Sequence, residues 1–401
     1  MLLLLVTLFS FTNAQSNKIE IGTIDTVYSK ILNEKREVWV YIPHHLIDNT
    51  LTDSKLYYPV LYLLDGNWHF PSVVGIIQQL SYVSGNSICP EMIVVGIANT
   101  DRVKDFTPTR DNNFSPTSGG NEKFISFIEK ELIPYIEAAY PVAPYRMLIG
   151  HSLGGLAVIN TLINHTDLFN AYVSIDPSMQ WNNLTSLKEA EKKLSEKKFT
   201  NAGLFLAIAN SMEKNMDTIK VKKDLSGNTL HIRSILELDK CLRTNKQNGL
   251  NYQSNYYINE NHGSVPLIAT YDALHFIFNY YDLRLTKNDY ADTSMALPQR
   301  IENHYNNISE KMGYKVNPSE NLINTLGYTS MMMKNFTRAE YYFKLNIKNF
   351  PDSFNVYDSL GDYYIAVGNK SQAVDMFTKA LSIMENPDIR EKLNKHQAEL
   401  N

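Results

Sequence analysis

The chain has 401 residues, of which 44% are hydrophobic and 20% charged, a composition typical of a globular protein of about two domains. Its formal net charge of −4 gives no basis for binding nucleic acid or an anionic membrane. With only Cys89 and Cys241, the sequence allows one disulfide and excludes both a disulfide scaffold and a cysteine-rich metal site.

Residues 1–14 form an apolar segment that is too short to span a bilayer and ends in a small residue, Ala14. The positively charged residues that usually precede such a segment are missing. We interpret residues 1–14 as a signal peptide. The mature chain is therefore expected to be exported, to the periplasm or outside the cell, with no membrane span after the signal is removed.

Between residues 15 and 285, apolar strand patterns alternate with helical ones. Period-2 alternation at residues 38–42 predicts a hairpin from segments 18–29 and 36–43. Further strands are predicted at 59–65, 92–98, 147–149, 171–176, 203–209 and 255–258, and helices at 121–140, after 155, and at 267–281. This alternation predicts an α/β fold with a mostly parallel sheet covered by helices on both faces.

The segment Gly150-His-Ser-Leu-Gly154 fits the G-x-S-x-G nucleophile elbow, with a predicted strand before it and a predicted helix after it. A sharp strand-to-helix turn holds the serine in a strained backbone conformation and needs glycine where the two elements meet. The N-terminus of the following helix favours developing negative charge. We therefore expect Ser152 to be a catalytic nucleophile.

The expected general base is His262, which lies past the last predicted strand in the loop 259–264. Such loops lie at the sheet edge that carries the elbow, and the chain order of this fold is serine, acid, histidine. Gly263 is expected to allow an unusual backbone that projects the imidazole.

The sequence does not decide which acidic residue holds the imidazole of His262. The loop after the strand at 203–209 offers Glu213, our first choice, and then Asp217. Glu260 lies two residues before His262, and a serine–histidine dyad without a fixed acid is a further alternative.

An oxyanion hole needs two N–H groups aimed at the developing alkoxide. We expect one from Leu153, which follows the nucleophile, and the other from the loop that contains Gly66 and Asn67. His69 in the same loop is expected to be structural. Trp181 either lines the acyl pocket or only packs in the core.

After residue 285 the strand patterns end. Leu326-Gly327, Ala339 and Phe343 recur 34 positions later as Leu360-Gly361, Ala373 and Phe377. This is the period of tetratricopeptide repeats. We predict a linker and docking helix at 286–316, lined by Ile301, Tyr305, Ile308 and Met312, and then two repeats with a capping helix at 317–401.

The chain resembles the esterase D-like putative esterases of the α/β-hydrolase superfamily, over roughly residues 18–282. That group includes S-formylglutathione hydrolases, trilactone siderophore esterases, feruloyl-type esterases and mycolyltransferases. The motifs that carry the resemblance are Leu64-Asp-Gly66, Gly96-Ile-Ala-Asn-Thr-Asp-Arg102, Gly150-His-Ser-Leu-Gly-Gly155 and His262-Gly-Ser-Val-Pro266. The resemblance is greatest to the siderophore-esterase side and implies ester hydrolysis through Ser152 and His262, with no cofactor and no metal.

The sequence thus predicts an exported serine carboxylic ester hydrolase that acts on a small-molecule ester. One alternative is an acyltransferase that uses the same triad. Another is a repeat protein that binds a protein partner and carries a minor or inert hydrolase domain. A last hypothesis is that the repeats pack against the mouth of the hydrolase domain and shape its pocket.

Overall fold

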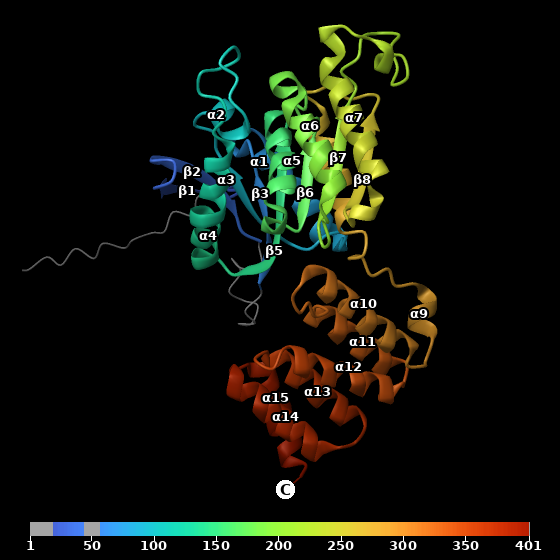
Figure 1. Ribbon diagram of the computed structural model, residues 1–401. Helices are drawn as coiled ribbons and strands as arrows, with labels where there is room; N and C mark the ends of the chain where they lie inside the picture. Colours follow the sequence, from blue (N-terminus) through green and yellow to red (C-terminus); the bar gives the residue numbers. More distant parts are fainter. Residues whose placement is uncertain (1–18, 44–56, 401) are drawn as a thin grey trace, which may run out of the picture.

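The computed structural model describes residues 19–43 and 57–400 (Figure 1). The predicted signal peptide, residues 1–14, lies outside the described residues. Within the described ranges, no helix is long and apolar enough to cross a membrane.

A single eight-stranded sheet forms the centre of the first domain, in the order β1-β2-β4-β3-β5-β6-β7-β8. Strand β2 pairs antiparallel with β1 and with β4, and every other pair is parallel. The strands are β1 Thr23–Ser29, β2 Glu34–Tyr41, β3 Tyr58–Leu63, β4 Ile93–Ile97, β5 Val142–His151, β6 Ala171–Ile175, β7 Gly203–Ala209 and β8 Asn251–Tyr257. The predicted hairpin and the mostly parallel sheet are confirmed.

Helices cover both faces of this sheet (Figure 1). They are α1 Gly66–Ser81, α2 Arg102–Phe106, α3 Asn121–Phe127, α4 Ile133–Ala139, α5 Leu153–Asn164, α6 Trp181–Glu196, α7 Leu230–Thr244 and α8 Val265–Ile277. One face packs against α3, α5, α6 and α7, and the other against α1 and α8, each with its own apolar core. The predicted helix at 121–140 is α3 and α4, joined by a π-helical segment, Ile128–Leu132. Both cysteines are free, so the disulfide that the sequence allowed does not form.

The C-terminal region is entirely helical among its described residues. Its helices are α9 Lys287–Ala291, α10 Ala296–Met312, α11 Glu320–Met332, α12 Phe336–Asn349, α13 Phe354–Ala366, α14 Lys370–Ile383 and α15 Pro387–Ala398. The predicted docking helix is α10, in which Ile301, Ile308 and Met312 are buried, and the predicted terminal helix is α15.

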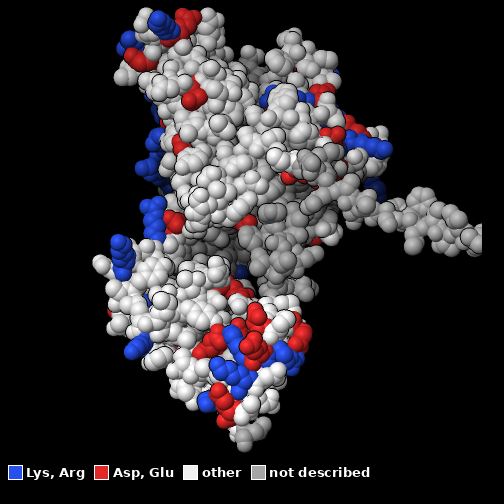
Figure 2. Space-filling model, turned by 180° about the vertical axis from the view of Figure 1, so that it is seen from behind, with Lys and Arg blue, Asp and Glu red and all other residues white. Residues whose placement is uncertain are grey.

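Two helical hairpins in this region repeat the same packing 34 residues apart. The ring of Phe343 on α12 lies against Gly327 on α11, where an added Cβ would be 2.6 Å away. The ring of Phe377 on α14 lies against Gly361 on α13 in the same way, at 2.4 Å. The period therefore reflects equivalent contacts, and the tetratricopeptide assignment stays a prediction. Acidic and basic side chains are intermixed on the outside of these helices (Figure 2).

The helical region docks through α10 at the edge of the sheet where the parallel strands begin. Met312 on α10 contacts the Tyr280 hydroxyl, and His304 contacts the carbonyl of Tyr281. The same core contains Tyr145, near the start of β5. The hypothesis that the repeats shape the mouth of the hydrolase domain is therefore wrong, because Ser152 follows the opposite end of β5 (Figure 1).

Candidate active site

The turn at Ser152 has the strained geometry of a nucleophile elbow. Ser152 has φ 60° and ψ −117°, an unfavourable combination for a residue with a Cβ. A Cβ on Gly150 would lie 2.4 Å from the carbonyl oxygen of Gly154, and one on Gly155 would lie 3.0 Å from that of Ile175. Glycine is needed here because strand β5, helix α5 and the end of β6 come together around the serine.

His262 lies in the loop between β8 and α8, at the same edge of the sheet, and its Nδ1 donates a hydrogen bond to Oδ2 of Asp176 at 2.6 Å. Since an ionised carboxylate only accepts, Nδ1 carries a proton and Nε2 is left with the lone pair of a base. Asp176 follows β6 directly and is fully buried. Its other oxygen accepts the N–H of Ala209 at 3.0 Å, which fixes the carboxylate.

Burial alone would raise the pKa of Asp176, but the hydrogen bonds from His231 and His262 outweigh it and hold that pKa well below its usual range. Asp176 is therefore ionised at neutral pH. A buried, ionised and oriented carboxylate on Nδ1 is what stabilises an imidazolium during proton transfer.

The acids expected from the sequence lie elsewhere. Glu213 is exposed in the loop after β7, and Asp217 uses its carboxylate to accept the N–H groups of Ile219 and Lys220. Glu260 contributes its backbone carbonyl to Asn210. Among the described residues, none of these three side chains is hydrogen-bonded to His262. Sequence reasoning missed Asp176, although it is the last residue of the predicted strand 171–176 and stands between serine and histidine in the chain.

The backbone of Gly263 also differs from expectation. Its φ is not in the left-handed region, and a Cβ there would meet Asn261 Oδ1 at an ordinary 3.5 Å. The side chain of Asn261 instead shapes the loop, because its Oδ1 accepts the N–H groups of Gly263 and Ser264 at 2.9 and 3.1 Å.

The Ser152 hydroxyl is partly exposed and lies 3.4 Å from the hydroxyl of Ser178. In the described part of the chain, no hydrogen bond joins Ser152 to His262. Such bonds are often long without substrate and tighten in the reacting complex. The centroid of the His262 ring lies 4.5 Å from that of His151, the neighbour of Ser152, so His262 and Ser152 lie at the same site.

Two helix N-termini meet at this site from opposite faces of the sheet. Strands β3 and β5 are parallel neighbours; α1 begins at Gly66 just after β3, and α5 begins at Leu153 just after β5. The first N–H groups of a helix have no partner within the helix. Those of Leu153 and of Gly66 and Asn67 are therefore available to a developing oxyanion, whereas the Trp68 N–H donates to Asp65.

A partly buried ion pair holds the loop before α1 against the elbow. Arg102 donates to both oxygens of Asp65, through Nε at 2.7 Å and Nη2 at 3.0 Å, and Nη2 also donates to the carbonyl of His151. Asp65 is fully buried and left-handed, and Asn99 donates a further hydrogen bond to it. Arg102 thereby ties the ends of β3, β4 and β5 together, which holds the turn at Gly66 in place relative to the elbow.

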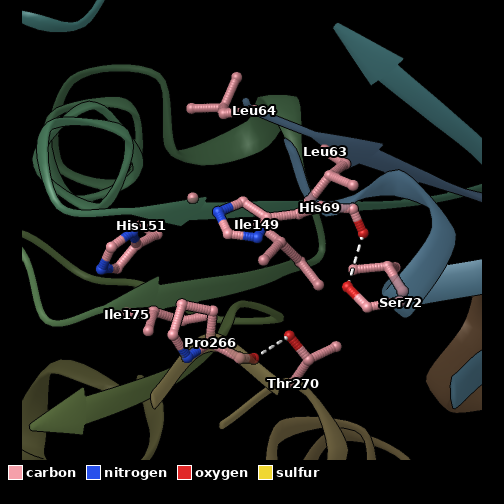
Figure 3. Close-up of a pocket in the computed structure, with 11 residues that line it drawn as sticks. Leu63, Leu64, His69, Ser72, Ile149, His151, Ile175, Pro266 and Thr270 are labelled. Atoms are coloured by element: carbon pink, nitrogen blue, oxygen red, sulfur yellow. Dashed lines mark hydrogen bonds between the residues drawn. The ribbon is translucent and has the colours of Figure 1, made fainter. Parts of the chain in front are cut away.

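A small pocket lies beside the elbow, lined by Leu63, Leu64, His69, Ser72, Val73, Ile149, Gly150, His151, Ile175, Pro266 and Thr270 (Figure 3). Within it the rings of His69 and His151 meet edge to face, with centroids 5.8 Å apart. Burial, followed by the nearby His262 and His69, lowers the pKa of His151 to about 4. Burial also lowers the pKa of His69. Both rings are therefore neutral at pH 7, as expected for structural histidines rather than bases.

Trp181 is buried at the start of α6, where its indole N–H donates to the carbonyl of Thr109 at 3.0 Å. Its ring meets Phe114 edge to face at 5.1 Å. Trp181 thus anchors the segment 107–119 to the start of α6. A role for Trp181 in lining the acyl pocket stays a prediction.

His231 on α7 is a second histidine bound to Asp176, and it was not among the site residues predicted from the sequence. Its Nε2 lies 3.0 Å from Asp176 Oδ2, and its Nδ1 lies 3.0 Å from Gln180 Oε1. The helical spacing of Ile232, Ile235 and Leu238 could have placed His231 on a helix that packs against the sheet. It could not have shown which strand end the histidine meets.

The chain is similar to known proteins in sequence and in fold. Residues 29–221 match the family model described as "Putative esterase". The chain is 34% identical over 173 residues to the ferri-bacillibactin esterase BesA of Bacillus subtilis, which is 38% of this chain and 58% of that protein. It is 27% identical over 154 residues to the siderophore triacetylfusarinine C esterase of Aspergillus fumigatus, 36% of this chain and 52% of that protein. The matched segment therefore spans between half and three fifths of these relatives.

Solved structures extend the similarity beyond that segment. An IroE-like serine hydrolase from Shewanella oneidensis is 29% identical, with a TM-score of 0.66 over 81% of this chain and 98% of that one. An uncharacterised protein from Capnocytophaga ochracea, 19% identical, has a TM-score of 0.60 over 94% of this chain and 99% of that one. The latter likeness concerns the fold alone, and its coverage includes most of the C-terminal helices.

Proposed function

We propose that this chain, whose residues 29–221 match the putative esterase family model, is a serine carboxylic ester hydrolase that works through an acyl-enzyme on Ser152. The observation that carries the proposal is a strained serine beside His262, whose Nδ1 is held by the buried carboxylate of Asp176. We assign the acid role to Asp176 in place of Glu213.

In the first half of the reaction, Ser152 Oγ attacks the ester carbonyl and His262 Nε2 takes its proton. Asp176 stabilises the resulting imidazolium, and the N–H groups of Leu153 and of the Gly66–Asn67 turn stabilise the oxyanion. The tetrahedral intermediate collapses, the C–O bond to the alcohol breaks, and His262 returns the proton to the leaving alkoxide.

In the second half, His262 takes a proton from water, whose oxygen attacks the acyl carbon. The bond to Ser152 Oγ then breaks, and the serine recovers its proton from His262. The free carboxylic acid leaves and the enzyme is restored. The network requires no cofactor for any of these transfers.

The names of the relatives support siderophore esters as the substrate class. BesA is a ferri-bacillibactin esterase, and the Aspergillus fumigatus relative is a siderophore triacetylfusarinine C esterase. We therefore propose that this chain cleaves ester bonds in a siderophore. Export through residues 1–14 is part of the same proposal, because siderophores reach a cell from outside.

The helical region has a separate proposed role. Its docking edge is opposite the catalytic edge, and stacked helical hairpins usually bind peptides or partner helices. We therefore propose that the two hairpins bind a protein partner. Because they lie at the edge of the sheet opposite the catalytic edge, such a partner would leave the site at Ser152 open to substrate.

The test uses the full chain without residues 1–14, and the same chain with Ser152→Ala. Both are assayed on p-nitrophenyl acetate, butyrate and octanoate, and on bacillibactin and triacetylfusarinine C. Ester cleavage that is lost in the variant supports the proposal. Simple-ester hydrolysis without siderophore cleavage would retain the reaction and reject the substrate class, and equal rates in both chains would reject the reaction.

A further inference from the structure

We propose that Asp176, His231 and His262 form a binding site for a divalent transition-metal ion of the zinc type, and that the ion inhibits the esterase reversibly. These residues come from the end of β6, from α7 and from the loop after β8. Their ligand atoms lie near enough to one another to hold one metal ion, and no other such group of three histidine, cysteine or acidic side chains is found among the described residues. The proposed metal binding is argued from the geometry of these residues alone, and only its effect on catalysis rests on the proposed function.

The three ligand atoms are close enough together to be brought onto one metal ion. Asp176 Oδ2 is 2.6 Å from His262 Nδ1 and 3.0 Å from His231 Nε2, and all three atoms lie within 4.8 Å of one another. Zinc bonds of about 2.0–2.1 Å place tetrahedral ligands about 3.3 Å apart. The shortest of these separations therefore has to open by about 0.7 Å, and the two nitrogens, which are at most 4.8 Å apart, have to approach by no more than about 1.5 Å.

The donor set selects the class of metal. Two imidazole nitrogens and one carboxylate oxygen are the ligands of many zinc sites with an open fourth position. Calcium and magnesium prefer sites made of oxygen atoms alone. The His262 side chain is 42% exposed and that of His231 is 20% exposed, which leaves a path for the ion and for a water molecule as fourth ligand.

Neighbouring groups orient two of the ligands for this purpose. Gln180 Oε1 lies 3.0 Å from His231 Nδ1, and it can accept a hydrogen bond from Nδ1–H when Nε2 binds the metal. The Ala209 N–H holds the other oxygen of Asp176 and leaves Oδ2 for the metal. This carboxylate is fully buried, so the surrounding residues keep it in place.

Inhibition follows from which nitrogen of His262 binds the ion. A metal on Nδ1 displaces the proton that this nitrogen donates to Asp176, and the neutral imidazole then carries its proton on Nε2. Nε2 is the nitrogen that has to accept the proton of Ser152. The metal therefore removes the base from the reaction and also takes the carboxylate that supports it.

Binding is tested first, without reference to catalysis, in the Ser152→Ala chain. Zinc chloride is titrated into this chain by isothermal calorimetry, with His231→Phe and His231→Gln as the site variants. His165→Phe is the matched control, because His165 also contacts a carboxylate, Glu122, at 3.1 Å and is similarly exposed, at 22%. We expect one zinc ion per chain, with affinity at least about tenfold weaker in both His231 variants and unchanged in the His165 variant.

Inhibition is tested in the active chain with p-nitrophenyl butyrate, each variant being compared with its own rate in EDTA. Zinc should inhibit the parent and the His165→Phe chain at the same concentration, and EDTA should restore both. The His231 variants should need at least about tenfold more zinc for half inhibition. Thermal melting of each variant checks that it is folded.

Zinc binding of equal strength in the parent and in both folded His231 variants would overturn the site. So would the absence of binding at millimolar zinc. Binding that depends on His231 but leaves the rate unchanged would overturn the inhibition. A chain without esterase activity in EDTA would instead reject the proposed function, while the calorimetric result for the site would stand.

Discussion

His262 and Asp176 are 86 positions apart in the chain, yet Nδ1 of the one lies 2.6 Å from Oδ2 of the other. Strand β6, which ends just before Asp176, is the parallel neighbour of β5, which ends at the nucleophile elbow. A carboxylate at this strand end is therefore within reach of the elbow and of the β8 loop at once. The expected effects of substitutions follow from this arrangement.

Replacing Ser152 by alanine removes the nucleophile, and kcat/KM should fall by about 10³-fold or more, because the remaining residues cannot form an acyl-enzyme. The matched control is Ser178→Ala, whose hydroxyl lies 3.4 Å from that of Ser152. The Ser178→Ala change should lower kcat/KM by less than about tenfold. Equal losses in the two variants, measured with p-nitrophenyl butyrate, would contradict the assignment of Ser152.

Asp176→Asn should reduce kcat by about 10²- to 10⁴-fold, because the amide neither stabilises the imidazolium nor fixes the tautomer of His262. Glu213→Gln tests the acid that the sequence favoured. Since Glu213 is exposed and has no hydrogen bond to His262, its variant should keep nearly full activity. The opposite ranking of the two kcat values would restore Glu213 as the acid.

Arg102→Lys should destabilise the protein by about 3 kcal/mol, because lysine cannot reproduce the two hydrogen bonds to the buried Asp65. The matched control is Arg243→Lys, because the Arg243 side chain in its pair with Asp239 is 57% exposed, and this change should lower the free energy of unfolding by less than about 1 kcal/mol. Denaturant unfolding measures both changes. A comparable loss for the two lysine variants would show that burial does not strengthen the Asp65 pair.

The stability of the first domain should fall in weak acid because of His151. In the unfolded chain its pKa is near 6.5, whereas in the folded protein burial lowers it to about 4. Between these values the unfolded state binds more protons, so the free energy of unfolding should decrease by up to about 3 kcal/mol as the pH falls from 6.5 to 4.

The His151→Gln variant checks this contribution. Its unfolding free energy should depend less steeply on pH between 6.5 and 4 than that of the parent, when both are measured in urea. An unchanged slope would mean that other groups cause the acid sensitivity.

Gly361→Ala should destabilise the helical region by about 1–3 kcal/mol, because the new Cβ would lie 2.4 Å from the ring of Phe377. Gly75→Ala is the control: Gly75 also lies within a helix, α1, but a Cβ there meets nothing within 4 Å. Alanine at Gly75 should therefore leave stability unchanged or raise it by about 1 kcal/mol. Thermal unfolding followed by circular dichroism compares the two, and a Gly361→Ala chain as stable as the parent would refute the packing argument.

The sequence determined the features that depend on neighbouring residues. Apolar runs fixed the central strands, glycines fixed the elbow at Ser152, and a 34-residue period fixed the helical hairpins. The apolar runs and the glycines are local patterns, because strand burial and backbone strain act over a few residues. The 34-residue period is visible in the sequence because each helical hairpin repeats the same contacts. His262 was also predictable, since the order of strands places the loop after the last one at the elbow edge.

Only the tertiary structure decided which carboxylate meets His262 and that His231 shares it. Both contacts join segments more than 50 residues apart, and they depend on the distance between strand ends and on the direction of each side chain. A carboxylate after β6 and one after β7 are equally compatible with the chain order. Burial and a hydrogen bond from the Ala209 N–H distinguish Asp176, and neither can be read from a linear pattern, because both arise only when β6, β7 and α7 pack together.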